Sequence, residues 1–230
     1  RRAAERILRR AAREGRENLR PEEAEALLSA YGIPFAPSRL VDTVEEARAA
    51  ARSLGFPVVL KAVAPELVHK SDVGGVRTDL RSEEEVTQAY TTVRRSVGSV
   101  SGLRIQVQAM VQGGREVILG MFHDPQFGPL LMFGLGGIFV EYLKDVTFGL
   151  VPIHRHDAEG MIASLRGHSL LEGARGQRAV DRRVLVEGLL RLSQLVGDLP
   201  QIEQIDINPF MACPRRRPSL AVDARVRLRI

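Results

Sequence analysis

The sequence predicts a fold of the α/β or α+β class. Helical periodicity alternates along the chain with short, apolar, β-branched runs, which is the pattern of helices packed on a sheet. The strand-like runs gather in two regions of the 230-residue chain, which is long enough for two coupled lobes around a sizeable core. Hydrophobic residues make up 44% of the chain and charged residues 27%, the balance of an ordinary globular protein.

Helix signals come first in the chain. Residues 3–14 are basic helix formers, and a proline in the first turn opens a second helix over residues 21–31. Thr43 and Glu46 have the spacing of a capping box, which predicts a helix over residues 44–54. Further helices are predicted over residues 82–97, 157–166 and 181–196.

Short apolar or alternating segments predict the strands. They cover residues 57–62, 76–80, 104–108, 116–121, 130–133, 202–207 and 220–222. Gln112-Gly113-Gly114 is a flexible break between two of them and indicates a division near residues 107–112. We therefore expect a basic helical segment over residues 1–18, a first subdomain over residues 19–107 and a second over residues 108–230.

The composition argues against several classes of protein. The net charge is +5, but aromatic residues are only 5% and acidic residues are interspersed, so nucleic acid is not an expected partner. No apolar run approaches the roughly 20 residues of a membrane span, and we expect no signal peptide. Cys213 is the single cysteine, which excludes an intrachain disulfide. Together these features predict a cytoplasmic setting.

The densest motif follows the strand at residues 57–62. It contains two of the three lysines of the chain and a glycine pair that leads into the next strand. Glycine amides can approach phosphate oxygens closely, and a lysine ammonium neutralises phosphate charge. A histidine in the same loop can carry a phosphoryl group covalently. The candidate phosphate-binding residues are Lys61, Lys70, Ser71, Gly74 and Gly75, with His69 as the candidate nucleophile; a solvated hairpin loop stays open as the alternative.

A second set of polar residues lies near the C-terminus. Asp206 and Asn208 are two apart on a predicted strand and therefore face the same side, and Asp223 ends the following strand. Carboxylate and amide oxygens that converge with phosphate are a typical arrangement for Mg²⁺. We expect Pro209 to end the strand pairing. A capped strand end with Asx turns is the alternative, although it leaves a carboxylate within an apolar strand unexplained.

Glycine is also frequent over residues 114–137, but the spacing matches neither a Rossmann fingerprint nor a P-loop. Four segments, taken in order, instead resemble the ATP-grasp domain of NDP-forming acyl-CoA synthetases, and most closely the beta subunit of ADP-forming acetate–CoA ligase. The resemblance covers about residues 19–227. Its motifs are LxPxEAxxLLxxYGIP, FPVVLKAVAPELVHKSDVGGV, GREVILGMFHDPQFGPLLMFGLGGIFVEYLKDV and IDINPF with AVDAR, at residues 19–34, 56–76, 114–146 and 205–225.

The resemblance implies an ATP-grasp fold, in which two lobes bind the nucleotide between them, and it implies roles for single residues. Lys61 matches a phosphate-contacting lysine, and His69 matches a histidine that receives a phosphoryl group and passes it to ADP. Asp206 matches an acid that steadies the phosphohistidine, which makes His69 and Asp206 the catalytic candidates. Asn208 and Asp223 match Mg²⁺ ligands. Three further residues match the nucleotide hinge: Gln108, Val111 and Glu116.

The implied cofactors are ATP or ADP and Mg²⁺, and the implied reaction is the reversible formation of ATP from ADP and a phosphohistidine. The family also needs a CoA-binding alpha subunit, or a fused domain, that carries the first phosphohistidine. Two alternatives stay open: the regulatory ATP-grasp region of a ligase-like protein acetyltransferase, and a nucleotide-sensing module without catalysis. Residues 215–217, all arginine, stand where the family has a short turn, and the resemblance gives them no role.

Overall fold

The chain forms two compact units. The computed structural model describes residues 1–64, 67, 73–137, 144–173 and 178–229. Unit 1 comprises Arg1–Phe35 and Gly113–Ile230, and unit 2 comprises Ala36–Gln112. One boundary therefore falls in the glycine-rich break that the sequence indicates. Residues 19–35, which we expected in the first subdomain, pack instead with the C-terminal part of the chain as a portion of unit 1.

Unit 1 is built on an antiparallel six-stranded sheet. Its strand order is β10-β8-β5-β6-β7, and β9 pairs with β8. The two long neighbours β5 and β8 form its centre. The strands are β5 (Arg115–Asp124), β6 (Gly128–Leu135), β7 (Val146–Leu150), β8 (Ile202–Ala212), β9 (Leu220–Ala221) and β10 (Ala224–Leu228).

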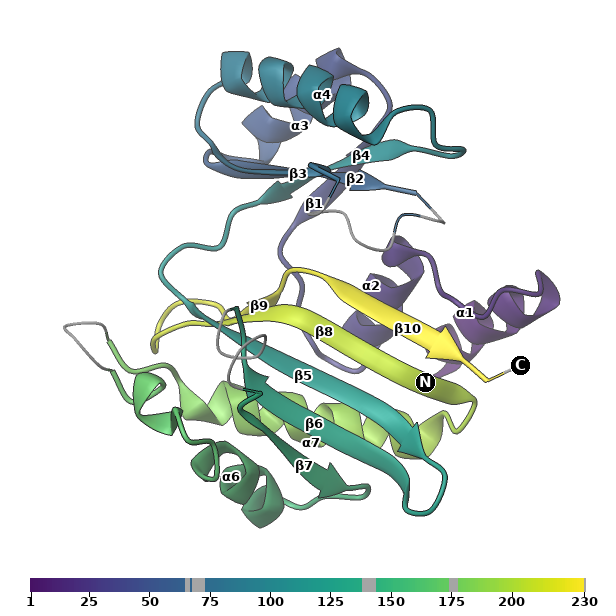
Figure 1. The fold of residues 1–230 in the computed structure, drawn as a ribbon, viewed down its shortest axis with the longest axis vertical. Coiled ribbons are helices and arrows are strands. Elements are labelled where there is room, and N and C mark those ends of the chain that lie inside the picture. The colour runs from purple at the N-terminus through teal and green to yellow at the C-terminus, as the bar shows by residue number, and fades with distance from the viewer. Residues whose placement is uncertain (65–66, 68–72, 138–143, 174–177, 230) are drawn as a thin grey trace. The chain divides into compact units, whose positions relative to one another are not determined.

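Helices complete the core of unit 1. In Figure 1, α7 (Arg182–Asp198) and α6 (Arg155–Ala163) lie against β5, β6 and β7, and α2 (Pro21–Ala30) lies beside β10. α1 (Arg2–Arg13) packs on α2 through Ala4, Leu8 and Ala11, which are buried on one face of the helix. The core joins these helices to alternate residues of β5 and β8. A short 3₁₀ helix spans His168–Leu170.

Unit 2 is an antiparallel four-stranded sheet backed by two helices. The strand order is β1-β4-β2-β3. Thr43 caps α3 by accepting the amide of Glu46 at 3.2 Å, which confirms that capping prediction. The elements are β1 (Ser38–Val41), α3 (Val44–Leu54), β2 (Val58–Val63), β3 (Val76–Leu80), α4 (Glu83–Val97) and β4 (Arg104–Ala109).

Three strands were not predicted from the sequence, namely β1, β7 and β10. β1 has only four residues. In β7, Val146, Phe148 and Leu150 alternate with Thr147 and Gly149, but Phe148 and Leu150 are exposed at the edge of the sheet. β10 alternates in burial, whereas the sequence predicts the C-terminal strand at residues 220–222, which include β9. None of the described helices combines the length and hydrophobicity that crossing a membrane requires.

The prediction that Pro209 ends strand pairing is wrong. β8 continues to Ala212 and exchanges its partner at the proline: β10 pairs as far as Ile207, and β9 pairs from Phe210. Proline has no amide to donate, so the ladder is interrupted only locally. Asp223 consequently lies between β9 and β10 and does not end a strand.

The core of unit 1 can be tested at two phenylalanines, one on β6 and one in the turn that precedes it. Phe133 is fully buried in β6, whereas Phe127, in the turn before β6, is 65% exposed. Phe133→Ala should lower the free energy of unfolding by about 3–5 kcal/mol, because it removes buried apolar surface and leaves a cavity. The matched Phe127→Ala should change it by less than about 0.5 kcal/mol. Equal effects in urea unfolding would contradict this placement of the core.

Candidate functional site

Lys61 is a buried cation in unit 2. On β2, Val58, Leu60 and Ala62 join the core formed with α3 and α4, so the alternate residue Lys61 points to the other face of the sheet. Lys61 is only 6% exposed, and its Nζ donates to Oε1 of Gln108 at 2.8 Å. A buried ammonium is costly unless it is hydrogen-bonded. The predicted phosphate-contacting and hinge residues are thus held together.

The glycine pair lies directly beside the strand of Lys61. The amide of Ala62 donates to the carbonyl of Gly75 at 2.7 Å, and the register pairs Lys61 with Val76. Gly74 has φ +68°, a backbone conformation that favours glycine, and its carbonyl accepts from Arg77 at 3.1 Å. The hairpin therefore places the amides of Gly74 and Gly75 next to the end of β2.

The remaining candidate residues are not part of this pair or of the glycine hairpin as the structure describes them. His69, Lys70 and Ser71 are outside the residues that the structure describes. Val111 is partly buried in unit 2, just before the boundary at Gln112, whereas Glu116 belongs to unit 1.

Asp206 and Asn208 occupy one face of the sheet of unit 1. Ile205, Ile207 and Phe210 of β8 all point into the core, so the spacing of core residues changes from two to three at the proline. The β5–β8 register shifts at the same point. This is a β-bulge, which inserts one extra residue and redirects the strand. Asp206 and Asn208 therefore remain on the face away from the core.

The pairing with β10 brings Asp223 to the same place. Ala224 pairs with Ile207, and both are buried on the core face. The amide of Asn208 donates to the carbonyl of Asp223 at 3.1 Å, which continues the register by one residue. Side chains of directly opposed residues lie on one face of a sheet. The structure thus groups the three predicted residues at the junction of β8, β9 and β10.

The pKa of the Asp206 carboxyl is shifted by its surroundings. Burial raises the pKa of its carboxyl above the usual value, Arg225 opposes this effect, and the neighbouring Asp223 carboxylate raises the pKa further. Arg225 pairs with Asp206 across the β8–β10 ladder. Sequence reasoning gave Arg225 no role, although it stands two residues after Asp223. A partly buried acid beside a second carboxylate is a common feature of functional sites.

Glu116 lies against a second glycine pair. The amide of Gly136 donates to the Glu116 carbonyl at 2.7 Å. A Cβ atom at Gly136 would come within 2.8 Å of Cβ of Glu116, and one at Gly137 would lie 3.4 Å from its carboxylate. The glycines therefore permit the close approach of the Gly-rich segment to the first residues of β5.

The donors at this junction fit a magnesium ion. They are the amide oxygen of Asn208 and the carboxylate of Asp223, and Mg²⁺ prefers oxygen ligands in this small number, completed by water and substrate phosphates. The part of the chain that the structure describes contains no group of three or more His, Cys, Asp or Glu residues that could hold a metal ion.

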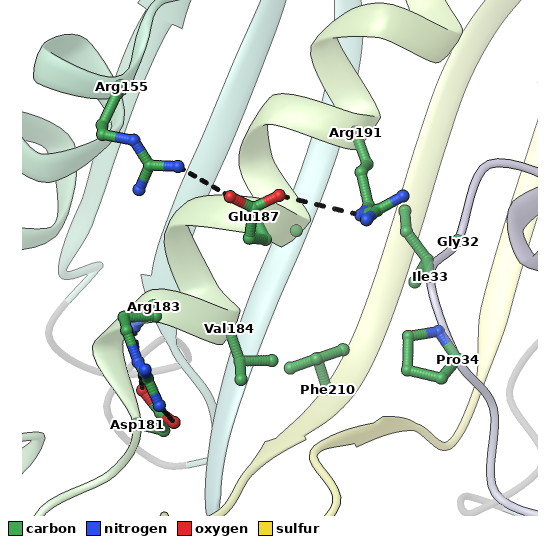
Figure 2. A pocket seen from close by; sticks show the side chains of 11 residues that line it. Gly32, Ile33, Pro34, Arg155, Asp181, Arg183, Val184, Glu187, Arg191 and Phe210 are labelled. Carbon is green, nitrogen blue, oxygen red and sulfur yellow. Dashed lines mark hydrogen bonds and ion pairs between the residues drawn. The ribbon is translucent and has the colours of Figure 1, made fainter.

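Unit 1 also has a cavity of about 470 Å³ beside the first turns of α7, with an apolar floor that includes Ile33 and Phe210. Figure 2 shows Glu187 placed between Arg155 and Arg191, at 2.7 Å and 4.0 Å. The third arginine of this cavity, Arg183, is bonded to a carboxylate of its own at 2.7 Å. Each cationic side chain of this cavity thus has an acidic neighbour.

The chain is similar to several known proteins. A family model described as an ATP-grasp domain matches residues 10–228. The beta subunit of ADP-forming acetate–CoA ligase I of Pyrococcus furiosus is 40% identical over 97% of this chain and 97% of its own length. The ADP-forming 4-hydroxybutyrate–CoA ligase of Nitrosopumilus maritimus is 39% identical over 98% of this chain. The chain spans only 33% of that relative.

Two solved structures of the dinucleotide forming acetyl-coenzyme A synthetase 1 of Ca. Korarchaeum cryptofilum are also similar. The first, in complex with coenzyme A, Ca-AMPCP and HgCl⁺, has a TM-score of 0.91 at 43% identity and covers 97% of this chain and 98% of its own. The second contains coenzyme A and Mg-AMPPCP, and its phosphohistidine segment points towards the nucleotide binding site. Its TM-score is 0.85 at 42% identity, over 98% of this chain and 100% of that chain.

The raised pKa of Asp206 leads to a prediction about how the stability of the fold depends on pH. An acid whose pKa is higher in the folded state stabilises the fold while it is protonated, and this contribution is lost as the pH rises through the folded pKa. Asp206→Asn mimics the protonated form. The variant should therefore gain melting temperature relative to the parent as the pH rises from about 4 to about 7. A difference in melting temperature that stays constant over this window would contradict the raised pKa.

Proposed function

Because the chain belongs to the ATP-grasp family, we propose that it is the nucleotide-binding, beta-type part of an ADP-forming acyl-CoA synthetase. The observation that carries the proposal is the junction of β8, β9 and β10, where Asp206, Asn208 and Asp223 share one face of the sheet. Oxygen donors in this number suit a metal–phosphate complex. The buried Lys61–Gln108 pair supplies a cation for phosphate in unit 2.

The proposed reaction passes a phosphoryl group from His69 to ADP. The P–N bond to the imidazole breaks, its electron pair returns to the ring nitrogen, and a terminal oxygen of ADP forms the new P–O bond of ATP. The second ring nitrogen keeps its proton, so a neutral histidine remains. A carboxylate that accepts this N–H holds the ring in the productive tautomer, and Asp206 takes this role.

Charge neutralisation accounts for the remaining residues. Lys61 contacts phosphate oxygens, and the amides of Gly74 and Gly75 add hydrogen bonds to them. Asn208 and Asp223 would hold Mg²⁺, which neutralises phosphate charge when it is bound. Gln108, Val111 and Glu116 match the nucleotide-hinge positions of the family. In such reactions the protein contributes mainly position and electrostatics.

The proposal also requires a second protein part. Both similar synthetase structures contain coenzyme A, one of them is described with a phosphohistidine segment, and the Pyrococcus furiosus relative is a beta subunit. We expect the CoA-binding, alpha-type part to supply the phosphoryl group to His69, either as a separate subunit or as a fused domain. The acyl substrate would then bind to that other part.

Lys61→Met tests the nucleotide site. Methionine keeps most of the buried stem but removes the charge. Mg-ADP at about 100 times its Kd should raise the stability of the parent by about 2.7 kcal/mol, because it binds only the folded state. A lost hydrogen bond from a charged group, about 1.5–3 kcal/mol, should weaken the affinity roughly tenfold or more. Arg39→Ala, at an exposed position of β1 in the same unit, is the control and should bind normally. Unchanged nucleotide affinity in Lys61→Met, measured by calorimetry, would refute the assignment.

His69→Asn tests the carrier role. Asparagine keeps some hydrogen bonding but has no nucleophilic nitrogen. In the enzyme reconstituted with its alpha-type part, ATP formation should be abolished, whereas Mg-ADP should still bind. A radiolabelled phosphoryl group should appear on the parent chain and be absent from the variant. Near-normal turnover of the variant would show that His69 is not the carrier.

A further inference from the structure

Unit 1 contains a second cavity, of about 600 Å³, whose lining is dominated by arginine. We call it the arginine pocket. The described residues that line it include no carboxylate. They are Gly113, Gly114, Arg115, Arg178, Val180, Pro214, Arg215, Arg216 and Arg217.

The arginine pocket is strongly positive. Its described lining carries five arginine charges and no negative one. Asp181 lies near Arg215, but its carboxylate is bonded to Arg183 at 2.7 Å and 3.0 Å. Like charges gathered in one cavity repel each other. An anionic ligand would relieve this repulsion.

The backbone that carries three of the arginines adopts an unfavourable conformation. The amide of Arg217 donates to the carbonyl of Pro214 at 3.0 Å and closes a β-turn over these four residues. Arg216, at the third position of the turn, has φ +79°, where glycine or asparagine is normally found. The turn therefore holds an arginine at a position where glycine would be more stable.

The walls of the arginine pocket are fixed by the fold. Gly113 has φ +69°, and a Cβ atom there would lie 2.7 Å from a guanidinium nitrogen of Arg217, so the glycine makes room for that side chain. Arg115 is half-buried at the start of β5, where it pairs with Ala212. The amide of Asp181 donates to the carbonyl of Cys213 at 3.0 Å and ties the segment before α7 to the end of β8. Three separate chain segments thus converge on one cavity.

The arginine pocket is distinct from the junction that contains Asp206. Arg115 pairs with Ala212 on the core side of the sheet, whereas the next residue, Glu116, pairs with Met211. Successive side chains of a strand point to opposite faces. Arg115 therefore faces the side that α7 covers, and Glu116 faces the side of Asp206 and Asn208.

Guanidinium groups bind phosphate oxygens in a bidentate manner, which favours phosphate as the ligand chemistry. Arginines from three segments surround a cavity and do not form a row. A row would suit an extended acidic peptide, whose residues are spaced about 3.3 Å apart. We propose that the arginine pocket binds a small polyphosphate, an anion that carries at least two linked phosphate groups, at a site separate from the nucleotide site.

The test is calorimetric titration of the full chain with inorganic triphosphate at low salt. Arg215→Gln/Arg216→Gln should weaken binding about tenfold or more, while Mg-ADP affinity stays unchanged. The matched control Arg6→Gln/Arg13→Gln removes the same charge from exposed positions of α1 and should change the triphosphate affinity less than about twofold. Raising the salt concentration should weaken triphosphate binding to the parent, because the arginines of the arginine pocket are largely exposed and salt screens their charges.

Arg216→Gly separates binding from folding. It removes one guanidinium and relieves the backbone at φ +79°, so the melting temperature should not fall while triphosphate affinity does. In Lys61→Met, triphosphate should bind as in the parent even where Mg-ADP binds weakly. Displacement of triphosphate from Lys61→Met by ADP or coenzyme A would assign the ligand to a nucleotide-borne diphosphate, and no displacement would assign it to free polyphosphate.

Three results would overturn the proposal. The first is equal triphosphate affinity in the parent and in Arg215→Gln/Arg216→Gln. The second is loss of triphosphate binding in Lys61→Met, which would place the anion in the nucleotide site. The third is tighter binding of hexaglutamate than of triphosphate, which would indicate an acidic polypeptide as the occupant. None of these results would alter the test of the proposed nucleotide function.

Discussion

The arrangement of unit 1 depends on β8, which pairs with β5 on one side and with β10 and then β9 on the other. The exchange of partners takes place at Pro209, where the missing amide would otherwise leave the ladder incomplete. The bulge at this point keeps Ile207 and Phe210 in the core although they are three residues apart. Asn208 follows Ile207 on the opposite face and is exposed beside Asp223. The bulge thus returns the strand to the core at Phe210 without moving the polar residues that precede it.

Unit 2 also has a polar side chain within a sheet. The residues of β2 are buried throughout, yet one of them is a lysine. Its hydrogen bond to Gln108 meets part of the cost of removing an ammonium from water. A methionine would fill similar space without this cost, so a buried lysine is better explained by an anionic ligand than by stability.

The arginines of the chain differ in whether acidic residues line the same cavity. Around the cavity beside α7, Glu187 lies between Arg155 and Arg191, and Asp181 binds Arg183, so opposite charges meet within the protein. On α1, the exposed ion pairs of Arg9 and Arg10 are of the kind that contributes little to stability. The described lining of the arginine pocket has no such acidic members. The described lining of this pocket therefore carries five positive charges.

Much of the fold follows from local signals. The helix over Val44–Leu54 begins at Thr43 because its hydroxyl caps the first turn, and β2 follows from a short apolar run. The edge strand β7 has only a short alternation of Val146, Phe148 and Leu150, and the structure leaves none of its residues fully buried. The pairing of residues 19–35 with the C-terminal part could not be predicted, since it depends on contacts between segments far apart in the chain.

The candidate site, like the fold, could be predicted only in part from the sequence. Residue type and spacing alone identified Lys61, Asp206, Asn208 and Asp223 as candidates, because cations, carboxylates and glycine pairs have distinctive chemistry wherever they stand. The registers of β8 with β5 and β10 decided which of these side chains share a face, and the bulge at Pro209 decided that Phe210 and not Pro209 joins the core. The convergence of three arginine-bearing segments was likewise a matter of tertiary structure. Chemical identity is local to a residue, whereas proximity depends on the pairing of distant strands.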